Sequence, residues 1–137
     1  MDAGLFVNFI LMIDGLEKGN GIPLQLAELP ADNLRWRVAG HADKDWFWKS
    51  GGRSVENIRS MLAIVGKDFS DFPRALEFGC GCGRMLLHMQ DVAQSTELHG
   101  VDIDSEGVAW AQAHIPWVQS SVNEGLPPLK FRDGFFD

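Results

Sequence analysis

A run of alternating glycines is the segment of this chain with the clearest chemical potential. Residues 77–84 read Glu-Phe-Gly-Cys-Gly-Cys-Gly-Arg. A side chain at the glycine positions would hold a ligand away from the backbone or require an unfavourable positive φ. Glycine therefore allows a tight turn whose amides, at the start of a helix, favour a carboxylate or phosphate group. The segment predicts a ligand-binding loop.

The spacing of these glycines and one downstream carboxylate narrow the ligand class. The dinucleotide fingerprint G-x-G-x-x-G, begun at Gly79, would need a glycine where Arg84 stands, which disfavours a pyrophosphate ligand and a nucleotide-dependent oxidoreductase. Asp102 follows about 20 residues after the loop, at the end of a predicted strand. Its carboxylate can accept two hydrogen bonds from ribose hydroxyls, each worth roughly 1.5–3 kcal/mol. Loop and carboxylate together predict a nucleoside ligand.

Strands and helices alternate around these residues and predict how they are positioned. Apolar runs predict strands over residues 75–78, 97–102 and 117–120. Helical spacing predicts a helix after the loop, through Met85, Leu86, Met89, Val92 and Ala93, and another over residues 105–114, capped by Ser105 or Asp104. Such alternation predicts parallel strands side by side with right-handed crossovers and helices on the sheet faces.

The N-terminal part has weaker patterns. Glycines and prolines between residues 15 and 53 predict short elements and loops, and residues 34–38 alternate apolar and basic side chains as a half-buried strand does. The cluster Trp46-Phe47-Trp48 fits either core packing or a wall of a ligand pocket. Residues 55–65 have helical spacing, with Ser54 as cap and Gly66 as stop. We therefore divide the chain into an extension that covers the domain, residues 1–53, and a core, residues 54–137.

Three motifs in order resemble one enzyme family. E-x-G-x-G-x-G at residues 77–83, followed by G-V-D-I-D at residues 100–104, resembles the first two motifs of class I S-adenosylmethionine-dependent methyltransferases. Residues 126–137 are similar to the stretch that leads into the fourth strand of that family. The resemblance implies a Rossmann-like three-layer α/β sandwich, S-adenosylmethionine as cofactor, and methyl transfer to an acceptor that is unidentified and expected to be a small molecule.

The resemblance also implies roles for individual residues. The glycines would pass close to the methionine part and the ribose, while Glu77 would brace the loop or reach the amino group through water. Asp102 would hold the ribose, Ile103 would pack on adenine, and the turn at Val122 and Asn123 would meet the adenine edge. The family often has an acidic residue in that turn, where this chain has none. The expected cofactor-binding residues are Glu77, Phe78, Gly79, Cys80, Gly81, Gly83, Arg84, Asp102, Ile103, Val122 and Asn123.

No fixed catalytic residue is expected, because methyl transfer from a sulfonium depends chiefly on orientation and desolvation. If the acceptor needs a base, the candidates are His41, Asp43 and Asp45, each of which also fits a surface or capping role. Cys80 and Cys82 are expected to be small loop fillers.

The resemblance implies further strands that build the acceptor half of the domain, and we expect this half to be missing after Asp137. Residues 135–137 resemble the opening of a fourth strand, so the fold is expected to be truncated there. The first strand would then be an edge with unpaired backbone groups, which predicts self-association. A cofactor-binding module without turnover is the alternative function.

Composition sets further bounds. The 137 residues carry 12 Lys and Arg against 19 Asp and Glu, a net charge of −7, which argues against nucleic acid as a partner. Two cysteines make no disulfide framework, and C-x-C without further ligands predicts no metal site, so we expect a reducing, cytoplasmic location.

The apolar run at residues 5–13 is too short to span a bilayer and lacks signal-peptide flanks. It fits a core element or a self-association surface, and no membrane partner is expected.

Overall fold

The structure is a computed structural model that describes residues 28–136. The apolar run at residues 5–13 therefore lies outside the described residues. The described elements, in chain order, are α2 (Asp32–Ala39), α3 (Lys44–Ile64), the 3-10 turn η2 (Phe69–Asp71), β1 (Arg74–Phe78), the 3-10 turns η3 (Leu86–His88) and η4 (Val92–Gln94), β2 (Glu97–Asp102), α4 (Ser105–His114) and β3 (Val118–Val122). Among these residues, no helix is both long and apolar enough to cross a bilayer.

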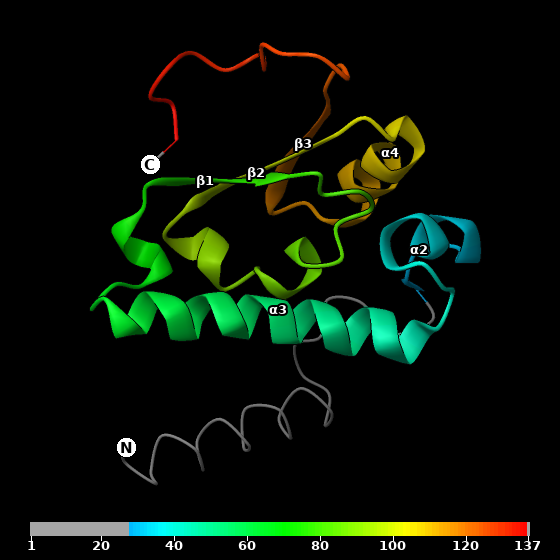
Figure 1. Ribbon diagram of the computed structural model, residues 1–137, viewed down its shortest axis with the longest axis horizontal. Coiled ribbons are helices and arrows are strands. Elements are labelled where there is room, and N and C mark those ends of the chain that lie inside the picture. Colours follow the sequence, from blue (N-terminus) through cyan, green and yellow to red (C-terminus); the bar gives the residue numbers. More distant parts are fainter. Residues whose placement is uncertain (1–27, 137) are drawn as a thin grey trace, which may run out of the picture.

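The three strands form one parallel sheet in the order β1-β2-β3 (Figure 1). Leu76 of β1 faces His99 of β2 in the register, and His99 in turn faces Gln119 of β3. All three carboxyl ends therefore meet at one edge of the sheet. The predicted α/β fold with adjacent parallel strands is confirmed, and it is Rossmann-like in its alternation of strands and helical segments.

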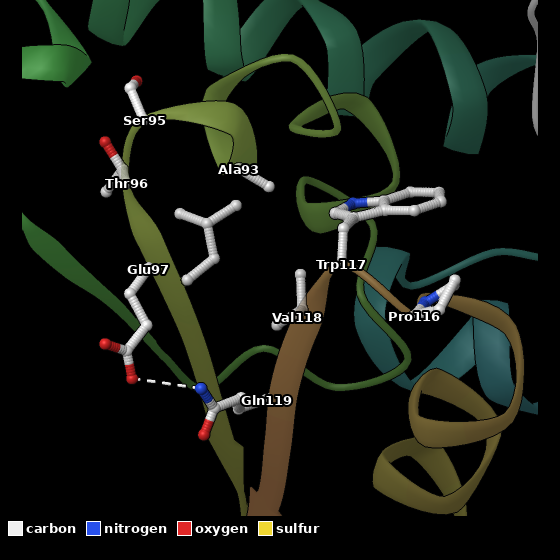
Figure 2. Close-up of a pocket in the computed structure, with 9 residues that line it drawn as sticks. Ala93, Ser95, Thr96, Glu97, Pro116, Trp117, Val118 and Gln119 are labelled. Atoms are coloured by element: carbon white, nitrogen blue, oxygen red, sulfur yellow. Dashed lines mark hydrogen bonds between the residues drawn. The ribbon is translucent and has the colours of Figure 1, made fainter.

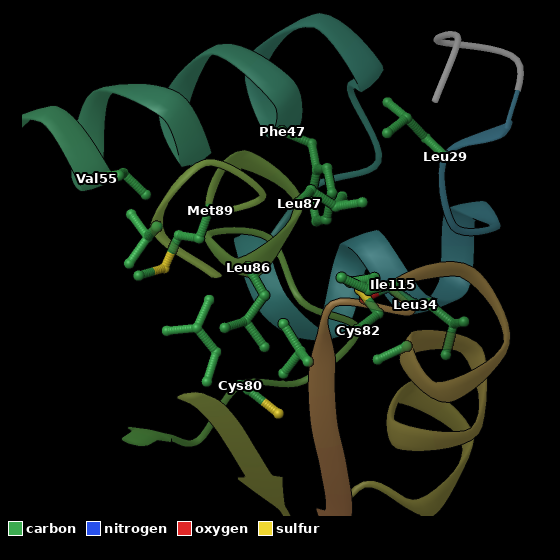
Figure 3. Packing of buried hydrophobic residues seen from close by; sticks show 14 of the residues in the cluster. Leu29, Leu34, Phe47, Val55, Cys80, Cys82, Leu86, Leu87, Met89 and Ile115 are labelled. Carbon is green, nitrogen blue, oxygen red and sulfur yellow. The ribbon is translucent and has the colours of Figure 1, made fainter. Parts of the chain in front are cut away.

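One face of the sheet carries the hydrophobic core. Figure 3 shows α3 packed over the chain that follows β1, with Phe47 on the side of this chain that faces α3 and Leu86 and Ile115 on the side toward the strands. Leu34 of α2 also belongs to this cluster. These side chains are almost fully buried, so α2, α3, α4 and the sheet share one core.

The other face of the sheet is met by the C-terminal segment, which runs back over the strands on the side away from α3 (Figure 1). Rings of Phe131, Phe135 and Phe136 lie 5.5, 5.5 and 5.3 Å from the ring of His99. The prediction that a fourth strand opens at Phe135 and Phe136 is wrong for these two residues, and Asp137 lies outside the described residues. Their rings gather on His99 and on one another, instead of the backbone pairing with a strand edge.

Strand β1 forms an edge of the sheet within the described part of the chain, since its only strand partner there is β2. The expected self-association through this edge stays a prediction. Light scattering after size-exclusion chromatography at micromolar concentration would test it, and a monomer would contradict it.

The predicted strand at residues 34–38 is wrong, because these residues lie in helix α2. Leu34 and Val38 are four residues apart, which is helical spacing as well as period two, so a five-residue window cannot separate the two patterns. Packing decides between them: Leu34 and Arg35 are buried while Trp36 is 60% exposed. Gly40 ends the helix with a φ of 75°.

Helix α3 begins ten residues before the predicted start at Ser54, so the expectation of short elements up to residue 53 is wrong for residues 44–53. Asp43 is the actual cap and accepts a hydrogen bond from the backbone N–H of Trp46 at 2.6 Å. Gly51 and Gly52 do not break the helix, because the chain after β1 packs directly against them. The helix therefore runs through residue 53, the predicted boundary between extension and core.

The α-helix predicted after the glycine loop is also wrong. Residues 86–88 and 92–94 form two short 3-10 turns, with bonds such as Met89 N–H to the Leu86 carbonyl closing over three residues. The predicted apolar positions Leu86, Met89 and Val92 are nonetheless buried. The pattern therefore identified the buried side of this segment but not its backbone geometry.

Candidate functional site

The glycine loop turns sharply at the carboxyl end of β1. Gly79, Gly81 and Gly83 have φ angles of 78°, 54° and 83°, in the left-handed region that L side chains rarely adopt. The N–H groups of Gly79 and Cys80 both donate to the carbonyl of Val101 in β2, at 2.8 and 3.0 Å. The loop is thereby held across the end of the neighbouring strand.

The three glycines face different surroundings. A Cβ on Gly81 would lie 2.5 Å from Cγ2 of Val38, and one on Gly83 would overlap Cδ1 of Ile115. A Cβ on Gly79 would meet no heavy atom within 4 Å. Gly81 and Gly83 are therefore required by the packing of the protein itself, whereas Gly79 leaves bare backbone open to a ligand.

Asp102 meets the loop directly. Its Oδ2 accepts a hydrogen bond from the N–H of Gly81 at 2.6 Å, and its Oδ1 accepts one from the N–H of Asp104 at 2.8 Å. Each carboxylate oxygen has a second lone pair and can accept another bond. Asp102 thus braces the loop and the turn after β2, and it keeps acceptor capacity for hydroxyl groups of a ligand.

Glu77 lies at the carboxyl end of β1 beside the loop. Its buried Oε2 has no hydrogen-bond partner among the described residues. Burial and, to a smaller extent, the charge of Asp102 raise the pKa of this carboxyl from 4.5 to about 7, against the opposing effect of the Arg84 charge. An unpartnered buried oxygen of this kind favours a ligand group that donates a hydrogen bond or carries positive charge.

The raised pKa of Glu77 predicts how stability depends on pH. The folded protein holds this proton up to about pH 7, whereas the unfolded chain releases it near pH 4.5, so the free energy of unfolding falls as pH rises between these values. We expect Glu77→Gln to remove this slope and to stabilise the ligand-free protein at pH 8 by up to about 3 kcal/mol. Urea unfolding of both proteins at pH 5 and 8 measures this, and equal pH dependence would contradict it.

Apolar side chains are exposed at the carboxyl ends of the three strands, beside the glycine loop. Phe78 ends β1, Ile103 follows β2 and Val122 ends β3, and their exposed fractions are 68%, 67% and 41%. The backbone N–H of Asn123 donates to the carbonyl of Asp102 at 3.0 Å, which holds the turn after β3 beside the end of β2. This edge therefore offers an apolar surface next to the loop, suited to a flat ring.

The two loop cysteines point into the core (Figure 3). Burial is the main cause that raises the pKa of each thiol to about 12. Cys80 and Cys82 therefore remain thiols and are not nucleophiles, which agrees with their expected role as loop fillers.

Helix α2 packs against the loop, a contact that no pattern in the sequence predicts. Besides the contact of Val38 with Gly81, Arg37 donates hydrogen bonds to Asp104 at 2.8 Å and to Glu106 at 2.5 Å, at the start of α4. The only signal in the sequence is the alternation of apolar and basic residues over residues 34–38, which is also typical of a strand. The N-terminal segment thus forms part of the site's wall.

The candidate bases have structural partners. Asp43 caps α3, Asp45 forms an ion pair with Lys49 at 2.9 Å, and His41 lies edge-on to Trp46 with ring centroids 4.4 Å apart. These contacts support the capping and surface roles considered from the sequence. Arg84, expected near the cofactor, donates from Nη1 to Ser50 on α3 at 3.1 Å.

A pocket of about 370 Å³ lies at the opposite end of the strands from the glycine loop, and Figure 2 shows the residues that line it. Glu97 and Val118, the first residues of β2 and β3, line it, so it sits at the amino ends of the strands. Ligands of open parallel sheets bind at the carboxyl ends. We therefore place the candidate site at the glycine loop and not in this pocket.

Comparison with known proteins gives two findings. Residues 76–137 match the family model described as a methyltransferase domain, a range that begins within β1 and includes the glycine loop, Asp102 and β3. The chain is also similar to the crystal structure of a TehB-like SAM-dependent methyltransferase from Corynebacterium glutamicum, with 18% identity and a TM-score of 0.32. That similarity covers 56% of this chain and 46% of the other, so the chain spans less than half of that protein. No curated protein matches the chain.

Proposed function

Because residues 76–137 of this chain match the family model described as a methyltransferase domain, we propose that the protein binds S-adenosylmethionine at the glycine loop and transfers a methyl group to a small-molecule acceptor. The observation that carries the proposal is the 2.6 Å hydrogen bond from Gly81 N–H to Asp102. This bond joins a loop with bare backbone to a carboxylate that can accept hydrogen bonds from ribose hydroxyls. Both lie at the carboxyl ends of the strands, where ligands of parallel sheets bind.

The residues present fit this cofactor. Gly79 gives access to bare backbone, Asp102 would accept from the ribose, and the exposed side chain of Ile103 would pack on adenine. The unpartnered Oε2 of Glu77 fits the ammonium group of the methionine part. When bound, S-adenosylmethionine supplies an activated methyl group, and the chain's own residues orient it, with Val38 of α2 holding the loop at Gly81.

A thermal-shift titration tests the cofactor assignment. We expect S-adenosylhomocysteine at 100 times its Kd to stabilise the protein by about 2.7 kcal/mol and NAD to leave the melting temperature unchanged. Stabilisation by NAD alone would contradict the proposal. Binding of S-adenosylhomocysteine without methyl release to any candidate acceptor would support the alternative, a cofactor-binding module without turnover.

The net charge of −7 supports a small-molecule acceptor over nucleic acid, because phosphate backbones bind clustered basic side chains. The free buried thiols of Cys80 and Cys82 fit a reducing, cytoplasmic location.

A further inference from the structure

A second pocket, of about 310 Å³, lies between helix α3 and the residue that follows the glycine loop. Its lining contains two arginines, three small polar side chains and one tryptophan: Trp46, Ser50, Arg53, Ser54, Asn57 and Arg84. The five α3 residues recur at helical spacing and form one face of the helix. Arg84, which follows the glycine loop, lines the pocket opposite this helix face.

Arg84 is held in place by neutral groups. Its Nη1 donates to Ser50 Oγ at 3.1 Å and to Ser54 Oγ at 3.4 Å. Ser50 is only 8% exposed and donates its own hydroxyl proton to the carbonyl of Phe47, so its oxygen is directed as an acceptor. These bonds fix the guanidinium without neutralising its charge.

The two pocket arginines lack the ion pairs that most arginines of this chain make. Within residues 28–136, the arginines at positions 35, 37, 59 and 74 each have a carboxylate within 4.0 Å. In the same range no carboxylate lies within that distance of Arg53, Arg84 or Arg132, and Arg132 lies over the ring of Phe135. The chain has 19 acidic residues against 12 basic ones, so two unpaired guanidiniums at one pocket require an explanation.

An oxyanion is the ligand group that this arrangement fits. A guanidinium offers a planar fork of donors that matches a carboxylate, and charge-assisted bonds of this kind are strong. Trp46 is 42% exposed, and Cζ of Arg84 lies 6.0 Å from its ring centroid. The pocket therefore combines two positive charges with a flat apolar surface.

The pocket also adjoins the proposed cofactor site. Arg84 follows Gly83 directly, and its charge acts on the carboxyl of Glu77. The backbone of α3 at Gly51 is packed so closely on the Arg84 carbonyl that a Cβ there would overlap it. The place of the pocket relative to the loop is therefore determined by close contacts.

We propose that this pocket binds the carboxylate of the methyl acceptor, which is a planar organic acid stacked on Trp46 with its charge between Arg53 and Arg84. The proposal rests on the proposed function, because it assigns the acceptor side of the same site. A carboxylate could also come from the amino-acid part of the cofactor, and the experiment separates the two sources.

Calorimetric titration of the full chain with benzoate, without cofactor, tests the pocket. We expect benzoate to bind and its neutral isostere benzamide to bind at least about tenfold more weakly. Arg53→Gln and Arg84→Gln should each weaken benzoate by about tenfold or more. The matched control is Arg59→Gln on the same helix, whose guanidinium is already paired with Asp91, and it should leave benzoate affinity unchanged. Equal binding of benzoate and benzamide, or equal effects of all three variants, would overturn the proposal.

The second arm uses S-adenosylhomocysteine, which carries an amino-acid carboxylate, and 5′-methylthioadenosine, which carries none. We expect benzoate to bind in the presence of S-adenosylhomocysteine, and Arg53→Gln to leave the affinity for both nucleosides unchanged. Two results together would assign the pocket to the cofactor and overturn the proposal. Benzoate and S-adenosylhomocysteine would compete for binding, and Arg53→Gln would weaken the binding of S-adenosylhomocysteine but not of 5′-methylthioadenosine. Binding of benzoate by a protein that binds neither nucleoside would overturn the proposed function while retaining the anion site.

Discussion

Replacing Asp102 by alanine is expected to weaken binding of S-adenosylhomocysteine by roughly 100-fold. The variant loses two hydrogen bonds to a charged acceptor, and about 3 kcal/mol corresponds to two tenfold steps in affinity. It also removes the brace that holds the N–H groups of Gly81 and Asp104. Calorimetric titration gives the affinity, and the melting temperature of the ligand-free variant reports the loss of the brace.

Two variants make this result specific. Asp102→Asn keeps an oxygen that can accept the hydrogen bond from Gly81 N–H, so it should preserve the loop better than Asp102→Ala does. It should still bind S-adenosylhomocysteine more weakly than the unchanged protein, because the asparagine side chain carries no charge. Asp133→Ala makes the same change of charge in the exposed C-terminal segment and should bind normally. Unchanged affinity in Asp102→Ala would refute the assignment of Asp102 to the ribose.

The second large effect is expected at Gly51 in the middle of helix α3. Alanine normally stabilises a helix interior by roughly 0.5–1 kcal/mol relative to glycine. Here the added Cβ would overlap the backbone carbonyl of Arg84 and lie 2.9 Å from Cδ2 of His88. A carbonyl cannot rotate away as a side chain can, so α3 must move off the loop. We expect Gly51→Ala to lower the free energy of unfolding by about 1–3 kcal/mol, as overpacking does.

The neighbouring glycine is the matched control. At Gly52, a Cβ would come no closer than 3.3 Å to Nδ1 of His88, a side-chain atom that can shift by a few tenths of an ångström. Gly52→Ala should therefore change stability much less than Gly51→Ala, although both change the same helix by one methyl group. Urea unfolding compares the two variants, and equal changes in the free energy of unfolding would contradict the prediction that the contact with the Arg84 carbonyl governs position 51.

The core of the site could be predicted because its signals are local. Strand β2 and helix α4 have the predicted bounds, and β1 and β3 differ from the prediction by a few residues. Short apolar runs between turn residues indicate strands without knowledge of their partners. Once two strands are parallel neighbours, their carboxyl ends must meet, so the proximity of Asp102 to the glycine loop followed from the order of the elements.

The wrong predictions concern segments whose secondary structure depends on long-range contacts. A local window favours Gly51 and Gly52 as helix breakers, yet α3 passes through both. The Arg84 carbonyl packs against Gly51, where a Cβ would overlap it, and the ring of His88 lies beside Gly52. Residues 34–38 fit two periods, and burial of Leu34 and Arg35 selected the helix. In both segments the secondary structure depends on packing against residues that are distant along the chain. A short window of sequence does not include those residues.

The amino-acid sequence by itself thus determined the order of strands and helices, the glycine loop and the carboxylate that meets it, because these depend on spacing along the chain. Only the tertiary structure decided that α2 covers the loop, that the Glu77 carboxyl is buried without a partner, and that Arg53 and Arg84 converge on one pocket. Burial and charge pairing are properties of groups brought together in space, and α3 brings its arginine to Arg84 across 31 residues of chain.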